Sequence, residues 1–522
     1  MSAIAAWRGK HARAAALAAL CAILFLTFLD NTIVSVALAG IQTSLSVSVT
    51  GLQWIVDGYM LAFAALMLTG GALGDILGRK KVMLTGVAIF CGGSVMAAIA
   101  PTTSWLIAGR IVMGVGAAAS EPGTLSLIRH IYPEPAPRAR ALGVWAAVSG
   151  VALSLGPVIG GVLVGDPVAN PGGWRWIFWF GVGLAALSFA AAAVTLTESK
   201  DPVGRKVDVP GLVLGAAAVM AATFAVIEGE NGGYGTWWIG FLFGLAIVLL
   251  VAFVFVERRV PDPVFKLDFL RDPTFTAANI VAFATNLSVF SVFFFTALYL
   301  QLIANFDGFH IALVFAALAA AMIVGGPIAG RWTARIGPRE PMVIGCFLAG
   351  LGLLLVDWKL TVHTTVAALS WPLAIAGLGF GIALVSMTAA VLGLVPPEES
   401  GMAASTVNTS RELGGVFGVA VLGAVVNAQL TGGLTAKLVK LGVPAKFREI
   451  VIQFVTTGGN ISTAESNPAA RGHEKLVAKV LNAAAGSAGH GIHLALTIGW
   501  VIVFSAGFIA LFAARHRPRK AA

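Results

Sequence analysis

The sequence predicts an all-α polytopic membrane protein with 14 transmembrane helices, and three observations support this fold class. Of the 522 residues, 58% are hydrophobic and only 11% are charged, whereas a soluble domain carries about 25% charged residues. The apolar residues gather in runs that reach the roughly 20 residues needed to cross a bilayer. The 62 glycines are typical of membrane helices, in which small residues allow close packing. A soluble multidomain enzyme, a disordered chain and a disulfide scaffold are therefore excluded.

The apolar runs divide the chain from end to end. They lie near residues 14–39, 52–74, 82–100, 104–128, 140–164, 175–196, 209–228, 236–256, 274–303, 310–332, 341–357, 365–395, 402–430 and 489–514. The first run follows three basic residues and ends in Ala37-Leu38-Ala39, as a signal peptide would. It is longer than the apolar part of a signal peptide and contains Asp30, so we expect an uncleaved first span.

The distribution of basic residues predicts the orientation of the chain. Most of the 34 Lys and Arg lie at the two termini and in the loops after spans 2, 4, 6, 8 and 10. Basic loops face the cytoplasm, so we predict a multi-pass protein of the plasma (inner) membrane with both termini cytoplasmic. The loop after span 12, with Glu398 and Glu399, is the exception. The net charge of +10 then reflects topology, and we expect no nucleic-acid partner.

The longest segment on the predicted outer side runs from about residue 431 to 488. Two of its stretches, 445–454 and 474–481, show the amphipathic pattern of helices. We interpret the segment as a cap on the outer surface, with partner binding as the alternative. His490 and His493 share a helix face but lack a third ligand, and the three cysteines are far apart, so we expect no metal site.

An internal repeat predicts the domain organisation. The stretches from Gly71 to Lys80 and from Gly330 to Arg339 both keep a Gly-x6-Gly spacing and end in basic residues. The copies lie eight spans apart, which equals a six-helix repeat plus one helix pair. Repeated bundles are a transporter architecture that holds substrate between the repeats. We therefore predict an N-terminal six-helix bundle (1–200), an inserted helix pair with its linker (201–270) and a C-terminal six-helix bundle (271–522).

Five motifs follow one another on the expected spans. They are Leu29–Leu38 on span 1, Gly71–Lys81 after span 2, Arg110–Gly116 on span 4, Gly156–Gly161 on span 5 and Trp174–Phe178 at the start of span 6. Through them the chain resembles, over essentially its whole length, the fourteen-helix drug:proton antiporter branch of the major facilitator superfamily. The resemblance implies a monomeric, proton-coupled drug exporter without a cofactor. Ala152, Gly181 and Gly183 depart from the usual pattern, which affects local helix geometry.

Charged residues inside the spans are the candidate groups for binding protons and substrate. They are Asp30, Asp57, Arg110, Glu121 and Glu412. A charge at the bilayer centre costs at least about 2.5–3.5 kcal/mol, so it needs a partner or a function. Asp30, Asp57 and Arg110 are expected at similar depths in the outer half of the N-terminal bundle. A structural ion pair is the alternative for Asp30 and Arg110, and an interfacial position is the alternative for Asp57.

The two glutamates belong to different bundles. Glu412 is the deep acid of the C-terminal bundle, and we expect it to bind substrate or protons. Its neighbour Arg411 points about 100° away on the helix, so the two need not pair. Glu121 lies in the cytoplasmic third of span 4, where it either titrates or lines an inner vestibule.

The fifth-span motif contains Gly156, Pro157, Gly160 and Gly161. Pro157 removes a backbone hydrogen bond and bends the helix, and Gly160 and Gly161 permit close approach of another helix. The resemblance implies that this antiporter motif seals an exporter against leak. An ordinary kinked packing helix is the alternative.

The motif after span 2 contains Gly71, Asp75, Gly78 and Arg79. The resemblance implies that these residues form a latch between the two bundles on the inner side, through contacts with helix ends and charges. The alternative is that Asp75 and Arg79 are simple anchors. The second copy carries Ala334 in place of Asp75, so any latch is one-sided.

The functional prediction is a proton-coupled exporter of lipophilic drugs or antibiotics. No ATP-binding Gly-x4-Gly-Lys-Ser/Thr stretch and no catalytic motif is present in the sequence, so we expect neither a cofactor nor an enzyme. The four intramembrane acids outnumber Arg110 and Arg411 by two. Because one acid must exchange protons, about one negative charge remains for the substrate, which favours monocationic or neutral compounds. The alternatives are an exporter dedicated to one endogenous metabolite, antibiotic or lipid and, more remotely, a membrane receptor or scaffold.

Overall fold

The architecture is that of a computed structural model. It describes residues 3–45, 47, 49–164, 172–199, 208–261, 263, 265–304, 306, 308–396, 399–440, 448 and 474–514. All regular structure within these ranges is helical. We call the first six helices the N-terminal bundle: α1 (Ala3–Leu45), α2 (Val49–Leu77), α3 (Arg79–Ala98), α4 (Thr103–Ile131), α5 (Pro135–Val164) and α6 (Arg175–Thr195).

The rest of the chain adds a helix pair and a second bundle. The pair is α7 (Val209–Gly232) and α8 (Trp237–Glu257), followed by the short 3-10 helix η1 (Leu267–Arg271). We call the remaining helices the C-terminal bundle: α9 (Pro273–Ser291), a π-helical turn η2 (Val292–Thr296), α10 (Ala297–Leu302), α11 (Gly308–Ile336), α12 (Arg339–Lys359), α13 (Val366–Leu394), α14 (Ser400–Lys440) and α17 (Glu474–Ala513). The helices α9 and α10, with the π turn between them, form one continuous span.

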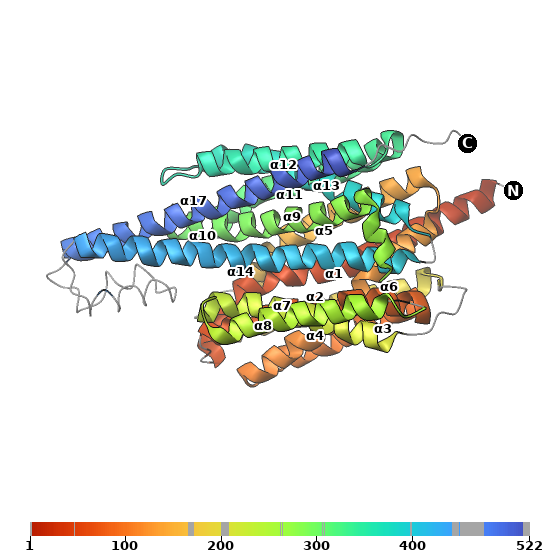
Figure 1. Ribbon diagram of the computed structural model, residues 1–522, viewed down its shortest axis with the longest axis horizontal. Helices are drawn as coiled ribbons and strands as arrows, with labels where there is room; N and C mark the ends of the chain where they lie inside the picture. Colours follow the sequence, from red (N-terminus) through yellow and green to blue (C-terminus); the bar gives the residue numbers. More distant parts are fainter. Residues whose placement is uncertain are drawn as a thin grey trace.

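The predicted fold class is confirmed. Thirteen spans within the described residues are long and apolar enough to cross a membrane, and α5 adds a further helix of 30 residues. The helices run roughly side by side along the long axis of the molecule (Figure 1). The start of α1 and the end of α17 lie at the same end of the bundle, as an even number of spans requires (Figure 1).

The inserted pair lies where the two bundles meet. Helix α7 packs against α2 of one bundle and α14 of the other, whereas α8 packs mainly against α7. Only 17% of the most apolar part of α8 is buried. Exposed side chains such as Phe241, Ile247 and Val251 make its outer face apolar, which fits a lipid-facing helix.

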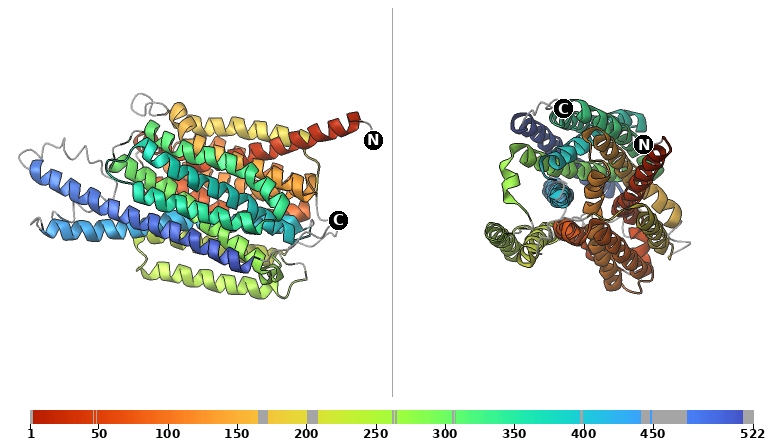
Figure 2. Two further views of the ribbon diagram at one scale, coloured as in Figure 1. Left: turned by 90° about the horizontal axis from the view of Figure 1, so that it is seen from above. Right: turned by 90° about the vertical axis from the view of Figure 1, so that its right-hand side faces the viewer.

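The last two long helices extend far beyond the other helices (Figure 2). The 41 residues of α14 span about 62 Å at 1.5 Å per residue, twice the roughly 30 Å of a hydrocarbon core. The two helices therefore continue beyond the predicted spans, which end near 430 and begin near 489. The helices continue because Leu434 and Leu438 of α14 form a small core with Ala483 and Ala484 of α17. The predicted helix at 474–481 is the start of α17, whereas 445–454 lies outside the described residues except for residue 448.

The structure repeats the turn that the sequence repeat predicts. Gly78 between α2 and α3 has φ 115°, and Gly337 between α11 and α12 has φ 95°. Residues with a Cβ rarely adopt this backbone region, which explains why both copies keep this glycine. In both bundles the helix after the turn packs against the next one, α3 on α4 and α12 on α13. The two bundles therefore share a local plan.

Candidate functional site

The first part of the site is a buried ion pair in the N-terminal bundle. Arg110 of α4 places Nη1 2.5 Å from Oδ2 of Asp30 on α1, and its Nε donates to the Ile55 carbonyl of α2 at 2.9 Å. The Arg110 side chain is 1% exposed and the Asp30 side chain 8%. One guanidinium thus joins three helices, and the spacing of residues on α1 and α4 correctly predicted that these two side chains share a depth.

Tyr59 completes this first cluster. Its ring lies under the Arg110 guanidinium, with 4.5 Å from Cζ to the ring centroid, and its hydroxyl donates to the Thr27 carbonyl at 3.4 Å. The tyrosine interacts electrostatically with Asp30, Arg110, Glu121 and Glu412. Tyr59 was not identified from the sequence. The chain has only four tyrosines, and the position of this one two residues after Asp57 could have indicated a role in the site.

The second part of the site joins the two bundles. Arg411 of α14 lies 3.8 Å from the Glu121 carboxylate of α4, and both side chains are at most 2% exposed. Nη1 of Arg411 also donates to Oδ1 of Asn408 at 3.1 Å. The arginine therefore lies against an acid of the other bundle, whereas the sequence predicted only that it need not pair with its neighbour Glu412. Glu121, for which two roles were open, is fully buried at the junction of the bundles.

Among the described residues Glu412 forms no salt bridge, whereas Glu121 lies 3.8 Å from Arg411. The charge of Glu412 acts on Glu121, and both acids are attracted to Arg411. Neither carboxylate oxygen of Glu121 has a hydrogen-bond partner among the described residues, because the 3.8 Å separation from Arg411 exceeds a hydrogen bond. Two carboxylates thus share one guanidinium between the bundles. Such a group can hold either a proton or a cation in addition to the arginine.

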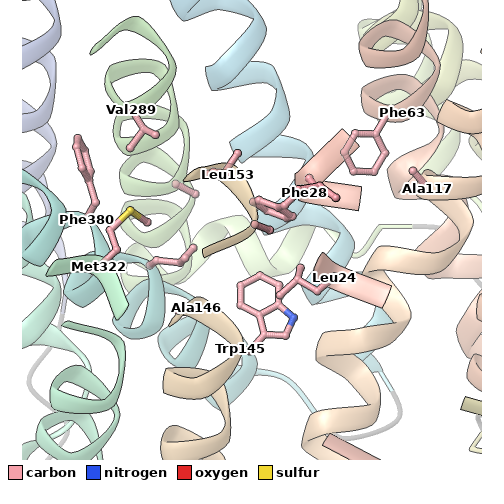
Figure 3. Packing of buried hydrophobic residues seen from close by; sticks show 14 of the residues in the cluster. Leu24, Phe28, Phe63, Ala117, Trp145, Ala146, Leu153, Val289, Met322 and Phe380 are labelled. Atoms are coloured by element: carbon pink, nitrogen blue, oxygen red, sulfur yellow. The ribbon is translucent and has the colours of Figure 1, made fainter. Parts of the chain in front are cut away.

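Aromatic side chains form the apolar wall of the junction. Phe28 of α1 and Trp145 of α5 meet edge to face with ring centroids 6.5 Å apart, and they lie next to each other between the bundles (Figure 3). The Arg411 guanidinium is 5.2 Å from the Phe28 ring and 5.5 Å from the Trp145 ring. Trp145 Nε1 donates to Thr124 at 3.2 Å, which fixes its orientation. An apolar wall with a few charged groups is typical of a small-molecule site.

Asp57 does not join either cluster. Its side chain is partly buried on α2, and its electrostatic neighbour is another acid, Glu228 on the inserted helix α7. Asp57 was expected at a depth similar to that of Asp30 and Arg110, but it does not take part in their ion pair. Its helix turns it toward the inserted pair instead.

At one end of the molecule the two bundles are in direct contact. We call it the basic end, and define it by the C-terminal ends of α2 and α4 and the N-terminal ends of α5 and α14. Asp75 of α2 accepts hydrogen bonds from the backbone N–H groups of Gly401 at 3.1 Å and Met402 at 2.9 Å, the first turn of α14. A carboxylate at a helix N-terminus stabilises that helix end. The contact joins the two bundles directly.

The neighbours of Asp75 support this contact. Arg79 pairs with Asp75 at 2.8 Å and donates to Ser199 Oγ at 3.0 Å. Gly71 lies so close to α14 that a Cβ there would come within 2.7 Å of the Gly401 carbonyl oxygen. Gly78 makes the turn after α2, where the Glu198 carboxylate accepts from the Lys80 and Lys81 N–H groups. Gly71 and Asp75 thus contact the other bundle directly, whereas Gly78 and Arg79 contact residues of their own bundle.

Arg129 forms a second contact at the basic end that the sequence did not reveal. Its guanidinium, at the C-terminal end of α4, donates to the carbonyls of Leu392 and Val395, the last turn of α13. The end of α13 is therefore held by the Arg129 cation and the start of α14 by the Asp75 carboxylate. Both charges match the helix dipoles. The Arg129 contact could not be predicted from the sequence, because the distribution of basic residues cannot distinguish a buried arginine from a solvated one.

The fifth-span motif lies along α1. A Cβ at Gly156 would collide with the Thr32 side chain and approach the Ile33 amide within 3.0 Å, so α5 touches α1 here. Gly160 is buried, but a Cβ at Gly161 would meet open space. The predicted close approach at Gly161 was therefore wrong, because that residue faces away from the neighbouring helices. α5 remains helical through Gly156 and Pro157.

A third polar cluster lies apart from the site. His493 of α17 is 2.6 Å from Asp357 of α12, and Thr497 donates to the same carboxylate at 3.0 Å. Within the described residues, no three His, Cys, Asp or Glu side chains are grouped as metal ligands. This histidine is thus a partner of an acid.

Comparison with known proteins identifies the family. The Major Facilitator Superfamily model matches residues 20–419. The multidrug resistance protein Stp of Mycobacterium tuberculosis is 31% identical, over 84% of this chain and 80% of that protein. The methylenomycin A resistance protein of Streptomyces coelicolor is 34% identical, over 77% and 83%. The tetracenomycin C resistance and export protein of Streptomyces glaucescens is 28% identical, over 94% and 89%.

Solved structures share the fold. A bacterial homologue of the human lysosomal transporter Spinster, in an inward-facing and unoccupied conformation, matches with a TM-score of 0.57 at 20% identity, over 98% of this chain and 99% of that chain. The proton:xylose symporter XylE bound to 6-bromo-6-deoxy-D-glucose matches with a TM-score of 0.57 at 12% identity, over 95% and 96%. The chain is thus a multi-pass membrane protein of the major facilitator superfamily, a family of transporters rather than enzymes, and it is related to the drug and antibiotic resistance exporters of the fourteen-helix branch.

Proposed function

We propose that this transporter is a proton-coupled exporter of lipophilic drugs or antibiotics that are monocationic or neutral. The observation that carries the proposal is the group formed by Glu121, Arg411 and Glu412 between the bundles. With Asp30 paired to Arg110 and Glu121 near Arg411, Glu412 is the carboxylate left over in the central site. A substrate between the bundles would meet this one negative charge.

Exchange follows from competition for Glu412. On the outer side Glu412 takes up a proton and the drug leaves; on the inner side it releases that proton and binds the next drug molecule. Coupling requires that the two ligands favour different states of the same group. Phe28 and Trp145, which form the apolar wall beside Arg411, would contact the lipophilic part of the drug.

The contacts at the basic end would act as the latch of this cycle. Basic residues concentrate in the loops at that end, and by the positive-inside rule it faces the cytoplasm. Asp75 and Arg129 join the bundles there. In this proposal they hold the inner side closed while the outer side exchanges drug for protons. Gly156 supports the seal by keeping α5 against α1.

The named relatives also support a second candidate function, the export of one antibiotic. Two of them carry the names of single antibiotics, methylenomycin A and tetracenomycin C. Both candidates use the same site, and the number of compounds exported separates them. A panel of chemically unrelated dyes and antibiotics therefore distinguishes a multidrug exporter from a dedicated one.

The test of proton coupling is efflux of a lipophilic monocationic dye from cells that lack their own pumps. We expect efflux that a protonophore abolishes and that Asp30→Asn, Arg110→Ala and Glu412→Gln each reduce, with the protein still present in the membrane. Asp268→Asn is the matched control, because Asp268 forms an exposed ion pair with Arg271 outside the site. Efflux that survives both the protonophore and all three substitutions would refute the proposal.

A further inference from the structure

The second copy of the sequence repeat lines a cavity that the proposed transport cycle does not use. The cavity has a volume of about 480 Å³ and lies at the basic end. Its walls come from α5 of one bundle and from α9, α11, α12 and α13 of the other. Residues 333–339 of the repeat form much of its lining, together with Arg138 and Ala139 of α5.

The cavity occupies the position that corresponds to the Asp75 contact. Gly71 lies against the first turns of α14, at Gly401 and Ser405, and Gly330 lies in the same way against Ala139 and Arg140 of α5. Four residues after Gly71, Asp75 binds the start of α14. Four residues after Gly330 stands Ala334, which lines the cavity. In the second junction α11 therefore approaches α5 as closely as α2 approaches α14, but it has no carboxylate at the position that corresponds to Asp75.

The start of α5 also differs from the start of α14. Pro135 and Pro137 occupy its first turn, and proline has no N–H to donate. Instead of free N–H groups, this junction presents three guanidinium groups, those of Arg138, Arg335 and Arg339. The junction is thus complementary to an anion through side chains rather than through the backbone.

The positive charge of the cavity is only partly balanced. Arg339 donates to the Leu511 carbonyl at 2.6 Å and lies 4.0 Å from Glu340, the one acid in the lining. The side chains of Arg138 and Arg335 have no hydrogen bond or ion pair to another described residue. Burial lowers the pKa of Arg138, because the cavity wall removes water from its charged form. Three cations and one acid leave two positive charges at a junction between the bundles.

We propose that this cavity binds a phosphate-bearing anion, which takes the place of the carboxylate that the second repeat lacks. Arginine binds phosphate through paired N–H donors and retains its charge when partly buried. The phosphate comes from the headgroup of an anionic phospholipid of the adjacent leaflet or from a soluble phosphate compound. Because Arg138 belongs to one bundle and Arg335 to the other, the anion joins them and stabilises contact at the basic end.

The test measures binding by the purified full-length protein, so it does not depend on transport. The delipidated protein in neutral detergent is titrated with dioleoylphosphatidylglycerol, with dioleoylphosphatidylcholine and with inorganic phosphate, and its thermal midpoint Tm is recorded. We expect phosphatidylglycerol to raise the Tm and phosphatidylcholine to raise it much less. Arg138→Gln and Arg335→Gln should each weaken the response about tenfold or more in anion concentration.

Matched controls separate a specific site from general surface charge. Arg140→Gln and Arg331→Gln remove exposed arginines from the same two helices outside the cavity lining, and both should respond like the wild type. Ala334→Asp supplies the missing carboxylate and should abolish the response while the protein stays folded. Arg138→Lys, which keeps the charge, should retain part of the response even if Arg138→Gln does not fold.

The arms of the titration identify the source of the phosphate. A response to phosphatidylglycerol alone assigns the site to a lipid headgroup, and an equal response to inorganic phosphate assigns it to a soluble compound. Equal responses in the wild type, the cavity variants and the two control variants would overturn the proposal. The absence of any response to either anion would do the same.

Discussion

Removal of the Asp75 carboxylate should open the basic end of the transporter. In the structure this carboxylate accepts two backbone hydrogen bonds from the start of α14, at 3.1 and 2.9 Å. These bonds join α2 of one bundle to α14 of the other, so they exist only while the two bundles touch. Asp75→Ala removes both, whereas Asp75→Asn keeps one neutral acceptor oxygen.

The size of the effect follows from these contacts. A hydrogen bond to a charged group contributes about 1.5–3 kcal/mol, and part of this is offset because the N–H groups regain water when the bundles separate. We therefore expect Asp75→Ala to destabilise the closed state by roughly 2–4 kcal/mol, a shift of about 30-fold or more in the opening equilibrium. Arg79 still donates to Ser199, so its charge is not left without a partner. Asp75→Asn should have about half of this effect.

The distance between the bundles reports this equilibrium. Spin labels at Lys81→Cys on α3 and Arg331→Cys on α11, both exposed, are compared by pulsed electron paramagnetic resonance after Cys21, Cys91 and Cys346 are replaced by serine. We expect a longer distance to gain population in Asp75→Ala. The control is Asp268→Asn, which removes an exposed ion pair within one segment. An unchanged distribution in Asp75→Ala, or the same change in the control, would refute the reasoning.

Three further predictions concern orientation, the central ion pair and substrate charge. A cysteine at Lys440, exposed at the end of α14, should react with a membrane-impermeant thiol reagent on intact cells, whereas a cysteine at Arg140 should not; the reverse labelling contradicts the orientation. Glu121→Ala leaves the buried Arg411 with only Asn408 and the attraction of Glu412 and should lower the stability of the purified protein by roughly 1–3 kcal/mol, measured as a loss of Tm, whereas an unchanged Tm would show that the pair is not structural. Rigid dications should be exported poorly compared with monocations in resistance assays. If residue 321 of α11, a helix without an acid between 310 and 330, faces the substrate, Ala321→Asp should improve their export. Equal protection against matched monocationic and dicationic dyes would contradict the charge count.

The structure also changes how orientation is best measured. Ser199 follows a predicted cytoplasmic span end, and its position alone suggests a labelling site. In the structure it is buried and bonds to Arg79, so a cysteine there would stay unreactive from either side. Arg140 is exposed at the same end of the molecule and is therefore the better reporter.

Composition and spacing determined the fold class and part of the site. An apolar run of about 20 residues has few stable structures other than a membrane helix, because its backbone must satisfy its own hydrogen bonds in lipid. Asp30 and Arg110 could be identified as candidate site residues from the sequence, because a charge inside a membrane span is rare and needs a partner or a function. The repeated glycines at 78 and 337 marked equivalent turns, because a backbone with positive φ favours glycine.

Contacts between distant segments were decided only by the tertiary structure. The contact between Glu121 and Arg411 depends on how α4 packs against α14. No local sequence pattern determines how these two helices are oriented toward each other. The length of α14 beyond residue 430 depended on the core it shares with α17. The role of Arg129 could not be predicted from the sequence, because it depends on the packing of the last turn of α13 against this side chain. Local sequence determines which segments enter the membrane, because transfer into lipid depends on each segment alone, whereas the pairing of charges across bundles depends on packing that only the whole chain establishes.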